Sequence, residues 1–340
     1  MLTIKYWLKE LQFEFPFAIS KGVKTVQPTF IVEITWRGLK AYGEAPAISY
    51  YNISTDQMAA DLDANKNAIE KFAFTDPKRF WHFLHHLIPN NPFLVCALDI
   101  AGWDLYGKIR RQPLYKLFNA DPTKIPFTDY TIGMDTKEVM LEKLNKHQSP
   151  IYKIKVGGIA DLEILEAIRS VTNSIIRVDA NAGWTYQQAL EMLPELKKLD
   201  VELIEEPLPI DLVEEMKALK KVSTIPLIAD ESCKNAKDIQ ECLDGFHGIN
   251  IKLTKCSGIT PALEMISIAK KYQLSTMLGC MNESSIGTAA LVHLSPLVDY
   301  LDADGPLLLK QDLASGLELH DHAWKLPVEP GLGIVIKEDL

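Results

Sequence analysis

The 340-residue sequence lacks several features that would place it in other protein classes. No apolar run approaches the roughly 18 residues of a membrane span, and the segment MLTIKYWLKELQF alternates apolar and polar residues instead of forming a signal core. The net charge is −9 and no block of Lys and Arg interrupts it, which argues against nucleic acid as a partner. We therefore expect a cytoplasmic protein that binds neither membranes nor nucleic acids.

Cysteine is also scarce. The five cysteines lie far apart and in no paired metal-ligand spacing, at positions Cys96, Cys233, Cys242, Cys256 and Cys280. An odd number of scattered cysteines is poor material for a disulfide framework. We expect reduced and mostly buried thiols, and because no complete glycine-rich fingerprint is present, no nucleotide cofactor.

The first third of the chain predicts a small α+β domain. Strands are expected at residues 3–13 and 29–45, followed by helices at 54–72 and 76–87. A further helix, from Pro92 to a terminating Gly107, is expected to bridge to the rest of the protein. We place this domain at residues 1–120, completed by the tail at about 318–340.

Residues 121–317 repeat a strand, a loop and a helix. Eight apolar strand segments follow one another, in the order TDYTIGM, IYKIKVGG, IIRVDANAGW, VELIEEPLP, PLIADES, GINIKLTKCSG, STMLGCMNES and DYLDADGP. Helices of ordinary length fit between them, for example at 161–172, 185–198 and 259–271, but no full helix follows the last strand. The pattern predicts an α/β fold in which a (β/α)7β TIM-type barrel follows the α+β domain.

Charged residues recur at the ends of five of these strands, at intervals of 24, 26, 25 and 22 residues: Lys155, Asp179, Glu205, Asp230 and Lys252. Strand ends of a (β/α)8-type barrel meet at one rim, so these side chains are expected to share one site. Three carboxylates without histidine or cysteine suit Mg²⁺, with Mn²⁺ as an alternative, and we expect one ion per subunit.

The lysines suggest acid and base chemistry. Lys153 and Lys155 are two residues apart and point to the same face of a strand, whereas Lys252 lies four strands away, across the barrel. Two cations beside a divalent metal should lower the pKa of a lysine toward neutrality, as a general base requires. A Schiff-base lysine is the main competing interpretation, against which the three carboxylates count.

Taken together, the segments KIKVGG, DANAGW, IEEPLP, ADES, NIKLTK and DADGP resemble the enolase superfamily, in its muconate-lactonizing-enzyme subgroup. The resemblance extends to ALDIAGWDLYGK and to the small domain, which in this family caps the barrel. It implies that Asp179, Glu205 and Asp230 bind Mg²⁺. It also implies that Lys155 and Lys252 are the acid and base catalysts and that Lys153 assists as a catalytic cation that also contacts the substrate.

Asp302 and Asp304 narrow the choice within the subgroup. Two carboxylates on one face at the rim would hold a substrate ammonium, and this Asp-x-Asp pattern resembles that of dipeptide epimerases such as the L-Ala-D/L-Glu group. The expected reaction inverts the α-carbon of the C-terminal residue of an Ala-Xaa dipeptide by two-base 1,1-proton transfer. Xaa is acidic, such as Glu, or it is small or hydrophobic. Further expected substrate contacts are Thr131, Cys280, Met281 and Lys24.

The resemblance places the flexible loop segments at Ala18–Gln27 and Ala45–Asn52 over the barrel mouth, where Lys21, Tyr50 and Tyr51 are further candidates for shaping the substrate pocket. An o-succinylbenzoate synthase-type lyase of the same superfamily is the leading alternative, since it uses similar lysines and carboxylates but does not need Asp302 and Asp304. A binding protein that has lost catalysis is a weaker alternative. A homo-oligomer is possible, but apolar patterning does not identify its interface.

Overall fold

The computed structural model describes residues 1–19 and 22–337. Its amino-terminal part is an antiparallel sheet in the order β1-β2-β3, with β1 at Thr3–Ile19, β2 at Gly22–Trp36 and β3 at Leu39–Pro46. The first two strands remain paired out to Ile19 and Gly22, with a register shift between Gln12 and Phe17. The described residues of Ala18–Gln27 are therefore a β-ribbon and not the expected loop, because the irregularity around Pro16 interrupts the alternating pattern that reveals a strand.

Four helices follow the sheet: α1 (Thr55–Glu70), α2 (Pro77–Leu87), α3 (Pro92–Arg110) and α4 (Leu114–Leu117), after a short 3₁₀ turn η1 (Ser49–Tyr51). The expected end of α3 at Gly107 is wrong, since the helix continues to Arg110 and ends at Arg111, whose φ is 54°. Gly107 serves packing instead. A Cβ atom at this position would lie 2.6 Å from Cα of Gly331, so the absence of a side chain lets the carboxyl-terminal tail approach α3.

Helix α3 contributes to two hydrophobic cores. Cys96, Ile100 and Trp103 belong to the barrel core, whereas Leu94 and Ala97 belong to the core beneath the β1-β2-β3 sheet. The tail returns to this sheet, because Ile334 and Ile336 pack in a third cluster around Ile31 of β2. The domain limits near residues 120 and 317 remain predictions.

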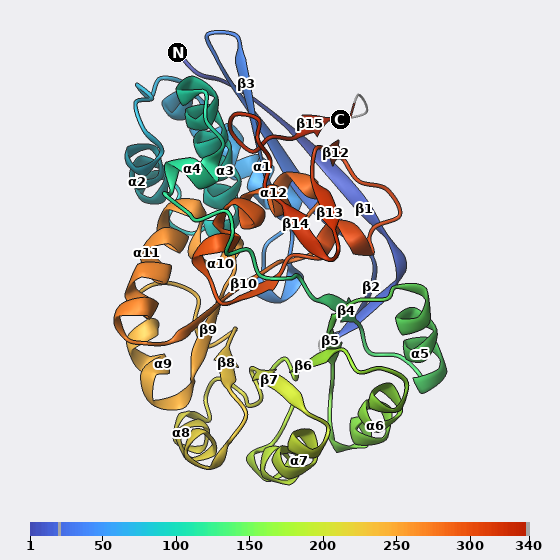
Figure 1. Ribbon diagram of the computed structural model, residues 1–340. Helices are drawn as coiled ribbons and strands as arrows, with labels where there is room; N and C mark the ends of the chain where they lie inside the picture. Colours follow the sequence, from blue (N-terminus) through green and yellow to red (C-terminus); the bar gives the residue numbers. More distant parts are fainter. Residues whose placement is uncertain (20–21, 338–340) are drawn as a thin grey trace.

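The rest of the chain forms an eight-stranded parallel sheet in the order β11-β10-β9-β8-β7-β6-β5-β4. Thr128 and Leu301 form a parallel bridge between the two edges, which closes the barrel. Figure 1 shows helices α5 to α9 and α11 arranged around the strands. The strands are β4 (Tyr130–Ile132), β5 (Ile151–Lys155), β6 (Ile175–Asp179), β7 (Val201–Glu205), β8 (Leu227–Ala229), β9 (Gly248–Ile251), β10 (Ser275–Gly279) and β11 (Tyr300–Asp302). The predicted fold class is confirmed.

The barrel helices are α5 (Lys137–Lys146), α6 (Leu162–Val171), α7 (Tyr186–Lys198), α8 (Val213–Val222), α9 (Ile239–Gly245), α10 (Leu253–Cys256), α11 (Ile259–Lys271) and α12 (Ser285–Leu294). In the described part of the chain, the 3₁₀ turn η4 (Gly305–Leu308) follows β11 in place of a full helix. The sequence predicted this, because it shows no full helix after the last strand. Further 3₁₀ turns are η2 (Ile159–Asp161) and η3 (Ser295–Leu297). The tail adds β12 (Ala314–Ser315), β13 (Glu318–His320), β14 (Ala323–Lys325) and β15 (Val335–Ile336).

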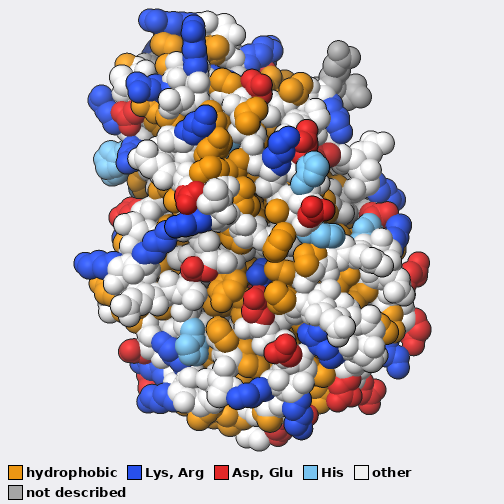
Figure 2. Space-filling view, viewed as in Figure 1, with side chains coloured by type: hydrophobic (Ala, Val, Ile, Leu, Met, Phe, Trp, Pro, Cys, Tyr) orange, Lys and Arg blue, Asp and Glu red, His pale blue; other side chains and the backbone are white. Residues whose placement is uncertain are grey.

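Surface and core agree with the expectations from composition. Figure 2 shows basic and acidic side chains interspersed on the visible face, with apolar side chains between them. All five cysteines are buried and free. Among the described residues, none of the helices combines the length and the apolar character that crossing a membrane requires.

Candidate active site

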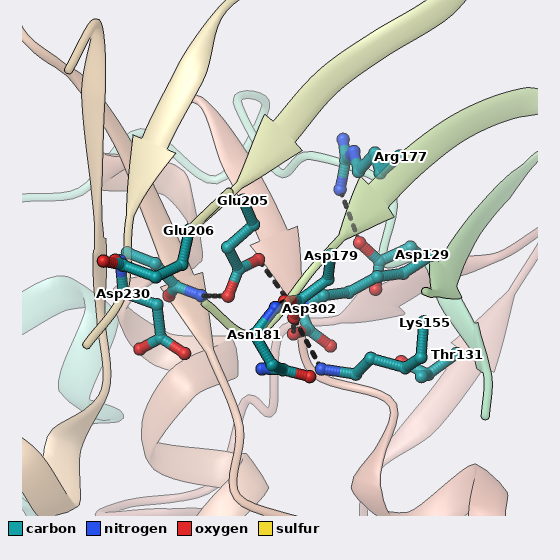
Figure 3. Close-up of polar contacts among 12 residues, drawn as sticks. Asp129, Thr131, Lys155, Arg177, Asp179, Asn181, Glu205, Glu206, Asp230 and Asp302 are labelled. Carbon is teal, nitrogen blue, oxygen red and sulfur yellow. Dashed lines mark hydrogen bonds and ion pairs between the residues drawn. The ribbon is translucent and has the colours of Figure 1, made fainter. Parts of the chain in front are cut away.

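Three carboxylates converge at the carboxyl ends of consecutive strands (Figure 3). Asp179 ends β6, Glu205 ends β7, and Asp230 follows β8 directly. Asp179 and Glu205 are register partners, and all three residues are at most 2% exposed. Asp129, deeper in the barrel, belongs to a different pair, because Nη1 of Arg177 lies 2.8 Å from its Oδ2. The structure thus brings the three predicted metal ligands together.

Two lysines flank these carboxylates from opposite sides. Nζ of Lys155, at the end of β5, lies 2.5 Å from Oδ2 of Asp179. Nζ of Lys252, directly after β9, lies 2.8 Å from Oδ2 of Asp230. Because β5 and β9 are four places apart in an eight-stranded barrel, the two amines approach the site from opposite walls, as predicted.

Lys153 lies between the carboxylates. Its Nζ is 2.7 Å from Oε2 of Glu205, 2.8 Å from Oδ2 of Asp302 and 3.1 Å from Oδ2 of Asp179. Burial disfavours the charged amine, but the surrounding carboxylates outweigh burial and raise the pKa of Lys153 well above its usual value. The pKa of Lys252 is raised in the same way by Asp230 and Glu205. The expected lowering of a lysine pKa is therefore not seen at these two lysines in the protein alone, since it presupposes that a metal neutralises these carboxylates.

The donor set fits a hard divalent cation. All three side chains offer oxygen only, which is the ligand type that Mg²⁺ and Mn²⁺ prefer. Among the described residues, Nζ of Lys153, at 2.7 Å, is the one donor group that approaches the buried Oε2 of Glu205, which keeps a further lone pair free. Burial and the charge of Asp179 raise the pKa of Glu205 to about 7. A buried oxygen with spare acceptor capacity, next to other carboxylates, is what a cation would stabilise.

The prediction missed three residues that hold the carboxylates in place. Nζ of Lys255 donates to Oδ1 of Asp230 at 2.5 Å, so the two oxygens of Asp230 are divided between Lys255 and Lys252. Nδ2 of Asn250 donates to Oε1 of Glu205 at 2.9 Å. Their signal was present in the sequence, since Asn250 lies two residues before Lys252 on the same strand face and Lys255 is the second lysine of NIKLTK.

The third missed residue is Glu206. Its Oε2 accepts hydrogen bonds from the backbone N–H groups of Asp230, at 2.6 Å, and of Ser232, at 3.2 Å. Burial and the nearby charge of Glu231 raise the pKa of Glu206 to about 8. Glu206 thus fixes the backbone that carries Asp230, a role that adjacency to Glu205 in IEEP does not reveal.

A second acidic group lies across the barrel mouth. Asp302 ends β11 and Asp304 follows two residues later, both at most 3% exposed. Oδ2 of Asp304 accepts from the backbone N–H of Thr131 at 2.6 Å, and Sγ of Cys280 lies 3.4 Å from its Oδ1. The charge of Lys153 outweighs burial and lowers the pKa of Asp302, whereas burial and the charge of Asp302 raise the pKa of Asp304 to about 6.

A cavity of about 40 Å³ lies between the two lysines, Asp302 and the capping domain. Lys155 and Lys252 line it from the barrel, together with Thr131, Cys280, Met281 and Asp302. From the capping domain it is lined by the half-buried Lys24 and by Phe17, Ile19, Ile48 and Tyr50. Tyr51 does not line it and packs against Phe93 instead, and Lys21 lies outside the described residues.

Nζ of Lys24 donates to Oε1 of Gln27 at 3.1 Å and lies 5.9 Å from the ring centroid of Tyr50. The half-buried side chain therefore lies along the wall of the cavity. A larger open groove, of about 910 Å³, runs along α2 past Trp81 and His82. Among the residues that the structure describes, no carboxylate lines that groove, so it lacks the oxygen ligands that a Mg²⁺ site needs.

The arrangement has a defined chemical capacity. A carboxylate bound at the cation site would place its α-carbon between two amines that approach from opposite sides. A cationic group of the same molecule would find two carboxylates at β11. Such a site can remove a proton from one face of a carbon acid and deliver a proton to the other.

Comparison with known proteins agrees with this geometry. Residues 135–340 match the family described as enolase C-terminal domain-like. The L-Ala-D/L-amino acid epimerase of Flavobacterium johnsoniae is 41% identical over 326 residues, covering 96% of this chain and 97% of that protein. The L-Ala-D/L-Glu epimerase of Bacteroides thetaiotaomicron is 35% identical over 340 residues, covering 98% of this chain and 88% of that protein.

Among solved structures, the dipeptide epimerase of Cytophaga hutchinsonii, complexed with Mg and the dipeptide D-Ala-L-Val, superposes with a TM-score of 0.92 at 28% identity. The match covers 100% of this chain and 97% of that one. The chain therefore belongs to the enolase superfamily, in the group that includes the dipeptide epimerases.

Proposed function

We propose that the protein is a Mg²⁺-dependent dipeptide epimerase that inverts the α-carbon of the C-terminal residue of Ala-Xaa dipeptides. The observation that carries the proposal is the combination of opposed lysines, Lys155 and Lys252, with the buried acidic pair Asp302 and Asp304. The relatives named as epimerases of Ala-containing dipeptides support it.

Asp179, Glu205 and Asp230 would hold one divalent cation per subunit, Mg²⁺ or in its place Mn²⁺. When bound, this cation would withdraw negative charge from the substrate carboxylate and so make the neighbouring α-proton more acidic. Lys153, within 3.1 Å of Asp179 and Glu205, adds a fixed positive charge beside the same position. Because that charge is positioned before the reaction, it stabilises the developing negative charge without reorganisation.

The proton steps belong to the two lysines. In one direction, neutral Lys155 takes the α-proton at Nζ, and protonated Lys252 delivers a proton to the opposite face. In the other direction the roles exchange. Each lysine must therefore alternate between its neutral and its protonated state, and both amines must reach the α-carbon.

The remaining groups would orient the dipeptide. Asp302 and Asp304 would bind the α-ammonium of the first residue, and Thr131, Cys280 and Met281 would contact the peptide and the first side chain. The second side chain would face the capping domain at Lys24, Phe17 and Ile19, whereas Tyr50 and Met281 would border the first side chain. There Lys24 favours an acidic Xaa, whereas Phe17 and Ile19 favour an apolar one, so both classes belong in the substrate panel.

The test is incubation with Mg²⁺ in D₂O of Ala-Glu, Ala-Val and other Ala-Xaa dipeptides, with deuterium uptake followed by mass and inversion by NMR. The proposal predicts uptake and inversion at the C-terminal α-carbon only. The same incubation with chelator in place of Mg²⁺ should show neither. Absence of uptake across the panel, together with formation of o-succinylbenzoate from its hydroxy-acid precursor, would assign the site to the lyase instead. Cytoplasmic location and homo-oligomer formation remain predictions from the sequence.

A further inference from the structure

A buried carboxylate in the capping domain is bonded mainly to the barrel. Glu44, on β3, is 0% exposed. Its Oε1 accepts from Oγ1 of Thr29 at 2.8 Å and from the backbone N–H of Ser284 at 3.1 Å. Its Oε2 accepts from Oγ of Ser284 at 2.6 Å and from the backbone N–H of Gly287 at 2.9 Å. Three of these four hydrogen bonds cross from the capping domain to the barrel.

These three bonds meet the start of α12, which packs beneath β3. Ser284 is the N-cap of this helix, because its hydroxyl accepts from the backbone N–H of Ile286 while donating to Glu44. At Gly287 a Cβ atom would lie 2.7 Å from Cγ of Glu283 and 3.3 Å from Oε2 of Glu44. The carboxylate thus satisfies N–H groups that a helix start leaves without partners. Helix α12 begins where the capping domain holds it.

The segment between β10 and α12 carries part of the cavity wall. Cys280, Met281 and Asn282 line the cavity, and Glu283 accepts the backbone N–H of Met281 at 2.7 Å. The segment has little room on its other side, because a Cβ atom at Gly305 would lie 2.3 Å from the carbonyl oxygen of Glu283. Strand β10 fixes one end of residues 280–284, and Glu44 fixes the other.

The opposite wall depends on the same strand of the capping domain. Tyr50, four residues beyond the end of β3, lines the cavity, and its hydroxyl lies 3.7 Å from Sδ of Met281. A shift of β3 relative to α12 would therefore change the separation of Tyr50 and Met281. Glu44 is a buried side chain that ties β3 to α12 by hydrogen bonds.

We propose that Glu44 is a positioning residue that sets the gap between Tyr50 and Met281 and thereby the size of first side chain that the dipeptide site accepts. The inference rests on the proposed epimerase function and names a determinant of its specificity. Glu44 does not line the cavity, so it acts through residues 280–284 and not by touching the substrate.

The test variant is Glu44→Gln. Each carboxylate oxygen accepts one backbone N–H, so either orientation of the amide sets an NH₂ group against a backbone donor that cannot turn away. We expect kcat/KM for Ala-Xaa to fall about tenfold, mainly through KM, which corresponds to the loss of one hydrogen bond to a charged group. The ratio of kcat/KM for Ala-Xaa to kcat/KM for Val-Xaa should also decrease.

Glu33→Gln is the matched control. Glu33 is a buried carboxylate on the neighbouring strand β2, but its hydrogen bonds, from Oη of Tyr42 at 2.7 Å and Oγ1 of Thr35 at 3.2 Å, stay inside the capping domain. Glu33→Gln should leave the ratio of kcat/KM for Ala-Xaa to kcat/KM for Val-Xaa unchanged. Ser284→Ala keeps its backbone N–H but loses the hydroxyl, so it should shift the ratio in the same direction as Glu44→Gln. This second variant carries the test if Glu44→Gln does not fold.

Amide hydrogen exchange supplies a readout that needs no substrate. Exchange of the peptide covering residues 280–287 should accelerate in Glu44→Gln and not in Glu33→Gln. If the wild type epimerises dipeptides but the variants keep its first-residue preference and its exchange pattern, the positioning role is wrong and the proposed function stands. If the wild type exchanges no α-proton in any dipeptide, the proposed function fails. If, in addition, Glu44→Gln leaves amide hydrogen exchange of residues 280–287 unaltered, the positioning role of Glu44 is wrong as well.

Discussion

Replacing Asp304 by Asn probes the acidic pair with almost no change in shape. Oδ2 of Asp304 is committed to the backbone N–H of Thr131 at 2.6 Å, so the amide oxygen of the new side chain must take that place. The NH₂ group then takes the place of Oδ1, which lies 3.4 Å from Sγ of Cys280. The variant therefore loses the negative charge, and its NH₂ group is a hydrogen-bond donor that cannot accept from the substrate ammonium. Leaving one partner of a buried charge pair unmatched costs about 3 kcal/mol, which is about a hundredfold in kcat/KM.

The assay compares two substrates of the same shape. Ala-Xaa carries the ammonium, whereas propionyl-Xaa has a hydrogen atom in its place. In the wild type the analogue should react poorly because two buried carboxylates face an apolar group. In Asp304→Asn, activity toward Ala-Xaa should fall about a hundredfold while activity toward propionyl-Xaa stays level or rises. Rates are followed by α-deuterium uptake.

Asp299→Asn is the matched control for removing a barrel carboxylate. Asp299 also accepts a backbone N–H, from Thr276 at 2.8 Å, but it lies at the start of the strands, away from the site. It should affect both substrates equally and slightly. If Asp304→Asn lowered the two activities by the same factor, the carboxylate would be structural and the ammonium-binding role would be refuted.

Three further outcomes follow from the charges of the site. Because the pKa of Asp304 is raised to about 6 and the ionised form is the one that binds an ammonium, kcat/KM should fall as the pH drops below about 6; a profile without this acid limb would contradict the role. Lys24→Met should lower kcat/KM for Ala-Glu relative to Ala-Val by about fivefold, and an unchanged ratio would show that Lys24 does not select acidic residues. Burial raises the pKa of Glu283 to about 8, so its contribution to stability is present below pH 4.5 and lost as the pH rises through 8. In urea unfolding, the free energy of unfolding of Glu283→Gln should therefore rise relative to that of the wild type by about 1.4 kcal/mol per pH unit between pH 5 and 8. A difference in unfolding free energy that does not change with pH would count against a buried, protonated Glu283.

The placement of the metal-type carboxylates was predictable because barrel geometry converts a sequence interval into proximity. One strand, one helix and two loops separate Asp179 from Glu205, and parallel pairing makes them register partners. The opposition of Lys155 and Lys252 follows from the same counting. These inferences need strand order alone, which a regular β/α repeat fixes.

Contacts outside that repeat were not predictable. Glu44 and Ser284 lie 240 residues apart in different domains, and no periodicity links them. A glycine at position 107 resembles the end of a helix, but glycine is needed there because Gly331 approaches closely, which only the folded tail reveals. The pairing of Phe17–Ile19 with Gly22–Lys24 was hidden by Pro16, because a strand that carries an irregularity loses its alternation.

The central claim is that two lysines serve opposite faces of one carbon, and single-turnover deuterium exchange with each epimer of the dipeptide tests it most directly. Lys155→Ala and Lys252→Ala would be compared, and in the latter Asp230 keeps Lys255 as a partner. Each variant should exchange the α-proton of only one epimer, a different one in each case, and neither should invert the centre. If either variant inverted the dipeptide at the rate of the wild type, the two-base account would be wrong.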